Sequence, residues 1–249
     1  MESRPALVLL HGLLGSLSYF SPSRHLPGLD TFTPDLLGYG ANAGASPGSP
    51  LSLELQAQFV GRYLREQVGR PSWVLGHSVG GAVAMEVARL APDRVLGVIS
   101  VEGNFTLNDA FWCRGIAPLA EEEWAAQYRR LQGDPKGWLE RSGVEVSPER
   151  LSWAEQILQN QPPETVQGMA RAVVRETALP GYLEGVREVV ERGTPLHLLA
   201  GERSVDGWDV PGWVKAAARS ATVLPGTGHM MMLEAPAAFC AAIQAAIEA

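Results

Sequence analysis

The sequence predicts an α/β fold in which a mostly parallel central sheet has helices on both faces and carries a helical cap insertion. Apolar runs of strand length alternate with stretches of helical period over residues 1–103. The alternation stops over residues 104–194, where the pattern is helical or polar, and it resumes over residues 195–249. We therefore expect one α/β core, formed by 1–103 and 195–249, with residues 104–194 inserted as a helical cap or lid.

The first half of the core opens with residues 6–10, a continuous apolar run that indicates a strand buried on both faces. Residues 53–68 have the pattern of a helix, because Leu55 and Phe59 lie on one apolar stripe and Arg62 lies off it. The other elements expected in this half are a weak strand at 31–34, a strand at 73–75, a helix at 82–90 and a strand at 95–101.

After the insertion the alternation returns. It predicts a strand at 195–200, a helix near 213–219, a strand at 221–224 and a last helix from 236 to about 247. Because helices separate the strands, we expect the strands to be parallel and their carboxyl ends to share one edge of the sheet. Ligands bind at this edge in open parallel sheets. The loops expected there begin at residues 11, 78, 102, 201 and 225.

Composition and charge narrow the possible functions. The formal net charge of −7 at pH 7 leaves no basic surface for a nucleic acid. No apolar stretch of about 18 residues is present, so we expect no membrane-spanning helix. The first apolar run is shorter than that of a signal peptide. We therefore expect a cytoplasmic protein whose two cysteines, Cys113 and Cys240, are reduced, with a single disulfide as the alternative.

The most informative motif is Gly76-His77-Ser78-Val79-Gly80, a G-x-S-x-G pattern between an expected strand and an expected helix. The glycines permit a tight turn in which a Cβ atom would obstruct the backbone. Such a turn lifts the Ser78 hydroxyl to the carboxyl edge of the sheet. It also places the backbone N–H of Val79 at a helix N-terminus, where developing negative charge is stabilised.

Three further segments accompany this turn in a fixed order along the chain. They are residues 9–16, which contain His11-Gly12, residues 35–40 and residues 226–229. With these four segments the chain resembles the α/β-hydrolase superfamily over nearly its whole length. The resemblance implies the α/β-hydrolase fold, with residues 104–194 as the cap and with the chain starting at the third strand of the family.

The resemblance also implies a role for each residue of the site. Ser78 is the nucleophile, and His229 is the base that takes its proton and later returns it to the leaving group. The backbone N–H groups of Leu13 and Val79 form the oxyanion hole. The side chains expected to border an apolar pocket are those of Leu13, Leu14, Val79, Phe111, Trp112 and Met230 to Met232.

The acid that orients His229 is the difficult assignment. Most members of the superfamily carry it about three residues after the glycine that ends the seventh strand of the family, here Gly201, but this position holds Ser204. Some branches take the acid from the end of the sixth strand, where this chain has Glu102. We expect Glu102 to be the acid, and Asp206, two residues beyond Ser204, is the alternative.

These features predict a cofactor-free serine hydrolase that cleaves a carboxylic ester, or a related thioester or lactone, with an apolar acyl or alcohol group. One alternative is a carbon–carbon bond hydrolase or lyase with the same triad. Another is a small-molecule receptor or binding protein on a hydrolase fold. No H-E-x-x-H motif, zinc-type His/Cys spacing or G-x-G-x-x-G loop is present, so no metal or cofactor is expected. The oligomeric state is left open.

Overall fold

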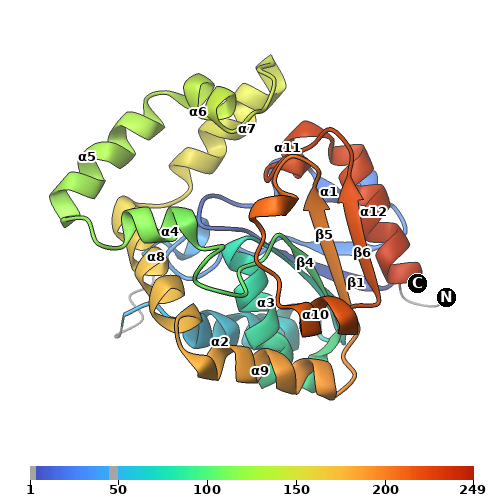
Figure 1. Ribbon diagram of the computed structural model, residues 1–249. Coiled ribbons are helices and arrows are strands. Elements are labelled where there is room, and N and C mark those ends of the chain that lie inside the picture. The colour runs from blue at the N-terminus through green and yellow to red at the C-terminus, as the bar shows by residue number, and fades with distance from the viewer. Residues whose placement is uncertain (1–3, 45–49) are drawn as a thin grey trace.

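The computed structural model describes residues 4–44 and 50–249 (Figure 1). Its centre is a six-stranded sheet in the order β2-β1-β3-β4-β5-β6, and every neighbouring pair of strands is parallel. The strands are β1 (Ala6–Leu10), β2 (Asp30–Phe32), β3 (Ser72–His77), β4 (Val95–Val101), β5 (Leu196–Gly201) and β6 (Ser220–Leu224). This arrangement confirms the predicted parallel α/β fold.

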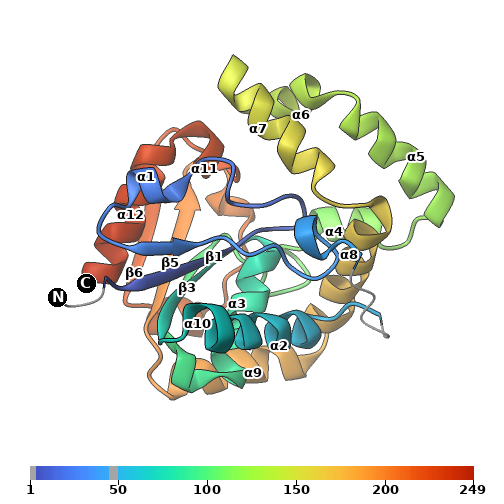
Figure 2. The same ribbon diagram turned by 180° about the vertical axis from the view of Figure 1, so that it is seen from behind.

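Helices cover both faces of the sheet, as Figures 1 and 2 show. One face carries α2 (Leu53–Tyr63), α3 (Val79–Leu90), α9 (Pro180–Glu191) and α10 (Gly212–Ala217), and the other carries α1 (Pro22–His25), α11 (Met231–Glu234) and α12 (Pro236–Glu248). The buried strand side chains alternate between the two cores. In β1, Val8 packs on the side of α2 and α3, whereas Leu7 and Leu9 pack on the side of α12.

The region 104–194 contains six helices and no strand. They are α4 (Phe111–Ile116), α5 (Glu121–Gln132), α6 (Pro135–Arg141), α7 (Pro148–Gln159), α8 (Pro163–Thr177) and α9. Helices α5 to α7 project beyond the sheet, whereas α8 contacts α2 and α9 packs against α3 (Figures 1 and 2). The insertion therefore has an outer part and a part that joins the helical layer of the core.

Most of the predicted boundaries differ from the observed ones by a few residues. The helix expected at 53–68 ends as α2 at Tyr63 and continues as a π-helical turn, Leu64–Val68. The expected strand at 73–75 is longer as β3, since β3 begins at Ser72 and ends with Gly76 and His77, residues that an apolar run does not mark. Ser52 caps the N-terminus of α2, since its side chain accepts a hydrogen bond from the Leu55 N–H at 3.0 Å.

Candidate active site

Ser78 lies at the sharp turn between β3 and α3. Its backbone has φ +54° and ψ −123°, a conformation that is costly for a residue with a side chain. The turn is tight: a Cβ atom on Gly76 would lie 2.1 Å from the Gly80 carbonyl oxygen, and one on Gly80 would lie 2.4 Å from the His11 oxygen. These close approaches explain why glycines flank Ser78 and why its side chain stands at the carboxyl edge of the sheet.

Glu102 follows β4 and has the same unusual backbone sign, with φ +43°. Its carboxylate is nearly fully buried and accepts three hydrogen bonds. Oε1 accepts from the Gly201 N–H at 2.8 Å and from the Ser204 hydroxyl at 2.6 Å. Oε2 lies 2.6 Å from Nδ1 of His229. The buried carboxylate is therefore fully partnered, and one of its partners is the imidazole.

His229 lies in the loop between β6 and α11, and this loop is held from two sides. The buried His77 ring donates from Nε2 to the His229 carbonyl oxygen at 3.0 Å. The Gly228 N–H donates to Glu234 at 2.8 Å, and Arg203 donates to the other oxygen of that carboxylate at 2.7 Å. The His229 side chain is 36% exposed, so its ring remains open to the pocket on one side.

The surroundings set the charge of the buried groups. Burial raises the pKa of Glu102, but the hydrogen bonds from His229, Ser204 and Gly201 and the charge of His229 outweigh burial, so the pKa is lowered below its ordinary value. Burial, followed by repulsion from His229, lowers the pKa of His77 to about 3. Glu102 is therefore ionised at neutral pH, and His77 is a neutral hydrogen-bond donor.

The loop after β1 lies directly beside Ser78. A Cβ atom on Gly12 would be 3.1 Å from the Ser78 Cβ atom, so the loop backbone approaches the turn closely. The Tyr39 hydroxyl donates to the Leu13 carbonyl oxygen at 3.1 Å, which fixes the next peptide of the loop. Burial lowers the pKa of His11 to about 4, and its Nε2 accepts from the backbone N–H that follows Asp35. These contacts leave the loop with one well-defined conformation.

Ser78, Glu102 and His229 line the same pocket, which has a volume of about 630 Å³. The pocket lies between the carboxyl edge of the sheet and helices α4 to α6. Its apolar side chains include four that were predicted to border it and three more from the insertion. They are Leu13, Phe111, Trp112 and Met230 from the prediction, with Ala110, Leu131 and Trp138 in addition.

Other predicted pocket residues lie elsewhere. Met231 and Met232 are fully buried in the core on the side of α12, because they form the first turn of α11. Val79 is buried in the opposite core, and Leu14 packs against both cores. The sequence could not separate these residues from the pocket, since apolar side chains beside a motif serve either purpose.

Asp206, the alternative acid, lies in the short 3-10 helix Val205–Gly207 and is exposed. It is not among the residues that line the pocket. Within residues 4–44 and 50–249, the carboxylate that forms a hydrogen bond with the His229 ring is that of Glu102. Ser204, at the usual acid position, instead donates a hydrogen bond from its hydroxyl to that carboxylate.

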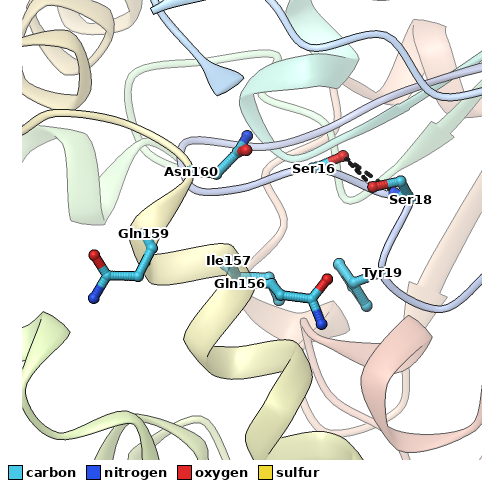
Figure 3. Close-up of a pocket in the computed structure, with 7 residues that line it drawn as sticks. All are labelled: Ser16, Ser18, Tyr19, Gln156, Ile157, Gln159 and Asn160. Atoms are coloured by element: carbon cyan, nitrogen blue, oxygen red, sulfur yellow. Dashed lines mark hydrogen bonds between the residues drawn. The ribbon is translucent and has the colours of Figure 1, made fainter. Parts of the chain in front are cut away.

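A second hollow of about 270 Å³ lies between the loop after β1 and the end of α7 (Figure 3). It contains none of the residues predicted for the site. Beside it, the Gly15 N–H donates to the buried Gln161 side chain at 2.8 Å, and Asn160 donates to the Gly15 carbonyl oxygen at 3.2 Å. Side chains of the insertion therefore bind both the N–H and the carbonyl oxygen of Gly15, in the loop that carries Leu13. The residues that line this hollow are Ser16, Ser18, Tyr19, Gln156, Ile157, Gln159 and Asn160.

Several residues around the pocket were not singled out from the sequence. Asn104 and Asp109 form a buried polar pair in its wall, and Arg141 also lines it. No motif marks these residues, because their place in the pocket wall depends on how the helices of the insertion pack over the sheet edge. In the described ranges, no group of three or more His, Cys, Asp or Glu side chains could hold a metal ion.

Two further observations concern the whole chain. Cys113 and Cys240 are both buried and unpaired, and they belong to cores on opposite faces of the sheet. None of the helices in the described part of the chain is long and apolar enough to cross a membrane.

Comparison with known proteins identifies the family. The chain matches the Alpha/beta hydrolase family over residues 7–242, and it therefore belongs to that family. This confirms the resemblance read from the motifs and the predicted class of enzyme, a hydrolase.

The individual proteins that match do so over part of their length or at low sequence identity. Lipase LipV of Mycobacterium tuberculosis is 35% identical over 103 residues, which cover 40% of this chain and 38% of LipV. The alignments span less than half the length of the curated relatives that the chain matches. MenH from S. aureus superposes with a TM-score of 0.70 at 20% identity, over 100% of this chain and 95% of MenH. A thermophilic esterase from Thermogutta terrifontis superposes with a TM-score of 0.68 at 22% identity, over 98% of this chain and 89% of the esterase. At such identities the two structures establish the fold alone.

Proposed function

We propose that this protein is a serine hydrolase that cleaves carboxylic esters, or related thioesters or lactones, with an apolar acyl or alcohol group. The observation that carries the proposal is the hydrogen bond between Glu102 and His229 in the pocket that Ser78 also lines. A buried carboxylate on Nδ1 fixes the imidazole tautomer and stabilises the imidazolium. Nε2 is then free to accept the Ser78 proton.

The reaction follows in two halves. The Ser78 oxygen attacks the ester carbonyl carbon while its proton passes to Nε2 of His229. The resulting oxyanion accepts hydrogen bonds from the backbone N–H groups of Leu13 and Val79, each of which typically contributes about 3 kcal/mol to the transition state. His229 then protonates the leaving alcohol as the C–O bond breaks. A water molecule, deprotonated by His229, attacks the acyl-enzyme and releases the acid.

The pocket wall supports the substrate class. Phe111, Trp112, Leu131 and Trp138 present apolar surface, and they come from the insertion rather than from the core. Helices α4 to α6 would therefore form the part of the cap that selects the acyl or alcohol group. The names of the similar proteins, a lipase and an esterase, are in keeping with this choice.

A fluorophosphonate probe tests the nucleophile. We expect stoichiometric labelling of the wild-type protein, with the adduct on Ser78 by peptide mass spectrometry and no adduct in Ser78→Ala. Ser72→Ala is the matched control, since Ser72 lies at the far end of the same strand. Absence of labelling on Ser78 would contradict the proposal and favour a binding protein on this fold.

A panel of nitrophenyl esters with acyl chains of increasing length tests the substrate class. We expect turnover that depends on chain length, as the apolar wall requires, and that is lost in Ser78→Ala. Labelling of Ser78 without turnover of any ester would instead favour carbon–carbon bond cleavage by the same three residues.

A further inference from the structure

Arg203 is a charged side chain in the loop after β5 that the proposed mechanism does not use. Its guanidinium donates to the Gly226 carbonyl oxygen, to the Gly143 carbonyl oxygen at 3.2 Å and to the Glu234 carboxylate at 2.7 Å. A guanidinium carries five donors in a rigid planar fork, so it can hold several acceptors in one fixed arrangement. Here it joins the turn between α6 and α7, the loop that carries His229 and the last residue of α11.

The contacts of Arg203 reach each of the three residues that directly precede His229. The Gly226 carbonyl oxygen accepts from the Arg203 side chain, and the Thr227 carbonyl oxygen accepts from the Arg203 backbone N–H at 2.9 Å. The Gly228 N–H donates at 2.8 Å to the carboxylate with which Arg203 is ion-paired. The backbone leading into His229 is therefore held either by Arg203 itself or through its ion pair.

The ion pair of Arg203 and Glu234 differs from an exposed surface pair. The Glu234 side chain is only 11% exposed, and its two carboxylate oxygens are divided between the Gly228 N–H and the Arg203 guanidinium. Hydrogen bonds to ionised groups are stronger than neutral ones. Loss of the cation would leave a mostly buried carboxylate without a counter-charge, which is costly. The conformation of the loop therefore depends on this pair.

The same short segment also supports the proposed acid. Ser204, the residue after Arg203, donates its hydrogen bond to the Glu102 carboxylate at 2.6 Å. The contact that needs both supports is the one between Nδ1 of His229 and Oε2 of Glu102, also at 2.6 Å. A displacement of about 1 Å at a reacting group can cost about 100-fold in rate. Two adjacent residues thus hold the two partners of this contact, one partner each.

We propose that Arg203, together with its ion-pair partner Glu234, is a positioning residue that keeps the His229 ring on the Glu102 carboxylate. Its bond to the Gly143 carbonyl oxygen also ties this position to the insertion. That the positioning serves catalysis rests on the proposed function. The positioning itself is a property of the folded chain, and it can be measured without any substrate.

The variant Arg203→Ala separates positioning from substrate binding, because Arg203 also lines the pocket. With a nitrophenyl ester we expect kcat to fall about tenfold and KM to change by less than about twofold. Arg171→Ala is the matched control: its side chain is likewise 43% exposed, binds two backbone carbonyls and one glutamate, and does not line the pocket. Its kcat should be unchanged. An effect of Arg203→Ala confined to KM would overturn the inference, since Arg203 would then act on the substrate.

Chemical rescue tests whether the missing guanidinium is the cause. The Arg203 side chain is partly open to solvent, so free guanidinium can enter the space that Arg203→Ala leaves. At about 50 mM, far below the molar range in which it unfolds proteins, guanidinium should restore part of the lost kcat, whereas urea, which has a similar shape but no charge, should not. Equal effects of the two additives, or no recovery, would contradict the inference. If Arg203→Ala fails to fold, Arg203→Lys replaces it, because a single ammonium cannot reproduce the fork and kcat should still fall.

Proton NMR distinguishes failure of this inference from failure of the proposed function, because it needs no turnover. The proton that His229 Nδ1 shares with Glu102 should resonate far downfield in the wild-type protein and in Arg171→Ala. In Arg203→Ala this resonance should broaden or disappear, because a loosened ring exposes the proton to exchange with water, and guanidinium should restore it. This result would support the inference even if no ester were hydrolysed. A wild-type protein without the resonance, or a folded Arg203→Ala variant in which its position and width are unchanged, would overturn the inference whether or not esters are turned over.

Discussion

The ends of β4 and β5 contribute differently to the same carboxylate site. The two strands are neighbours, with Val101 paired to Leu199 in the register. Past the end of β4, Glu102 supplies the carboxylate that meets His229; past the end of β5, Ser204 supplies only a hydroxyl that donates to it. Because adjacent strands lie about 5 Å apart, either end can bring a side chain to the histidine loop. The position of His229 at the sheet edge therefore fixes where a carboxylate must lie, but the carboxylate can come from the end of either β4 or β5.

The two ends also differ in their backbone. Glu102 has a positive φ, which is uncommon for a residue with a side chain, and Ser204 has an ordinary φ of −120°. Ser78 and Glu102 are two of the three non-glycine residues with positive φ in the described part of the chain. Such strain persists where surrounding contacts require it, and functional sites are where it gathers. The end with the positive φ is here the one that carries the carboxylate in contact with His229.

Among the variants that test this comparison, Glu102→Gln should have the largest effect on activity. The amide cannot stabilise an imidazolium and favours the wrong histidine tautomer, so kcat/KM for a nitrophenyl ester should fall by about 10³- to 10⁴-fold. Thermal unfolding should show that the variant remains folded. A loss of less than about tenfold would remove Glu102 from the proposed triad.

A swap of the acid between the two strand ends should have the next largest effect. In Glu102→Ala with Ser204→Asp, a carboxylate returns to the site from β5, and kcat/KM should rise about 10- to 100-fold above that of Glu102→Ala alone. The rise corresponds to one charge-assisted hydrogen bond regained by His229. No recovery in a folded double variant would mean that the loop after β5 cannot direct a carboxylate to His229.

The variant Ser204→Ala removes one of the three hydrogen bonds to the Glu102 carboxylate. A net hydrogen bond is worth about 1 kcal/mol, so kcat/KM should fall about fivefold near neutral pH. Hydrogen bonds to the ionised form hold the pKa of Glu102 below its ordinary value, and the loss of one raises that pKa. As the pH falls, activity should therefore be lost at a higher pH than in the wild-type protein. An unchanged kcat/KM near neutral pH would indicate that the Ser204 hydroxyl does not support the carboxylate.

Asp206→Asn should have the smallest effect, because this carboxylate is exposed and lies outside the pocket. We expect kcat/KM within about twofold of the wild-type value. A fall comparable to that of Glu102→Gln would reverse the comparison and return the acid to β5.

The features that could be predicted from the sequence are those written in short local patterns. The apolar runs predicted the strands, and the glycines around Ser78 predicted the tight turn, because both features depend on residues adjacent in the chain. The acid was harder, since Glu102 and Asp206 both follow strands at the same edge. Only the conformation of the two loops decides which carboxylate meets His229.

Contacts between residues far apart in the chain could not be predicted from the sequence. The hydrogen bond from Gly15 to Gln161 spans 146 residues, and nothing near either residue marks it. The Asn104–Asp109 pair is formed by residues close in the chain, but it lies in a pocket wall only because α4 builds the rest of that wall. The insertion therefore contributes pocket residues that a helical pattern alone cannot distinguish from packing residues.

The proton on Nδ1 of His229 gives the most direct test of the assignment of the acid to β4. In proton NMR spectra, a hydrogen bond of 2.6 Å to an ionised carboxylate should place this proton far downfield of the backbone amides. The account predicts that the resonance is present in the wild-type protein and in Asp206→Asn and absent in Glu102→Gln. A resonance that persists in Glu102→Gln and disappears in Asp206→Asn would contradict it.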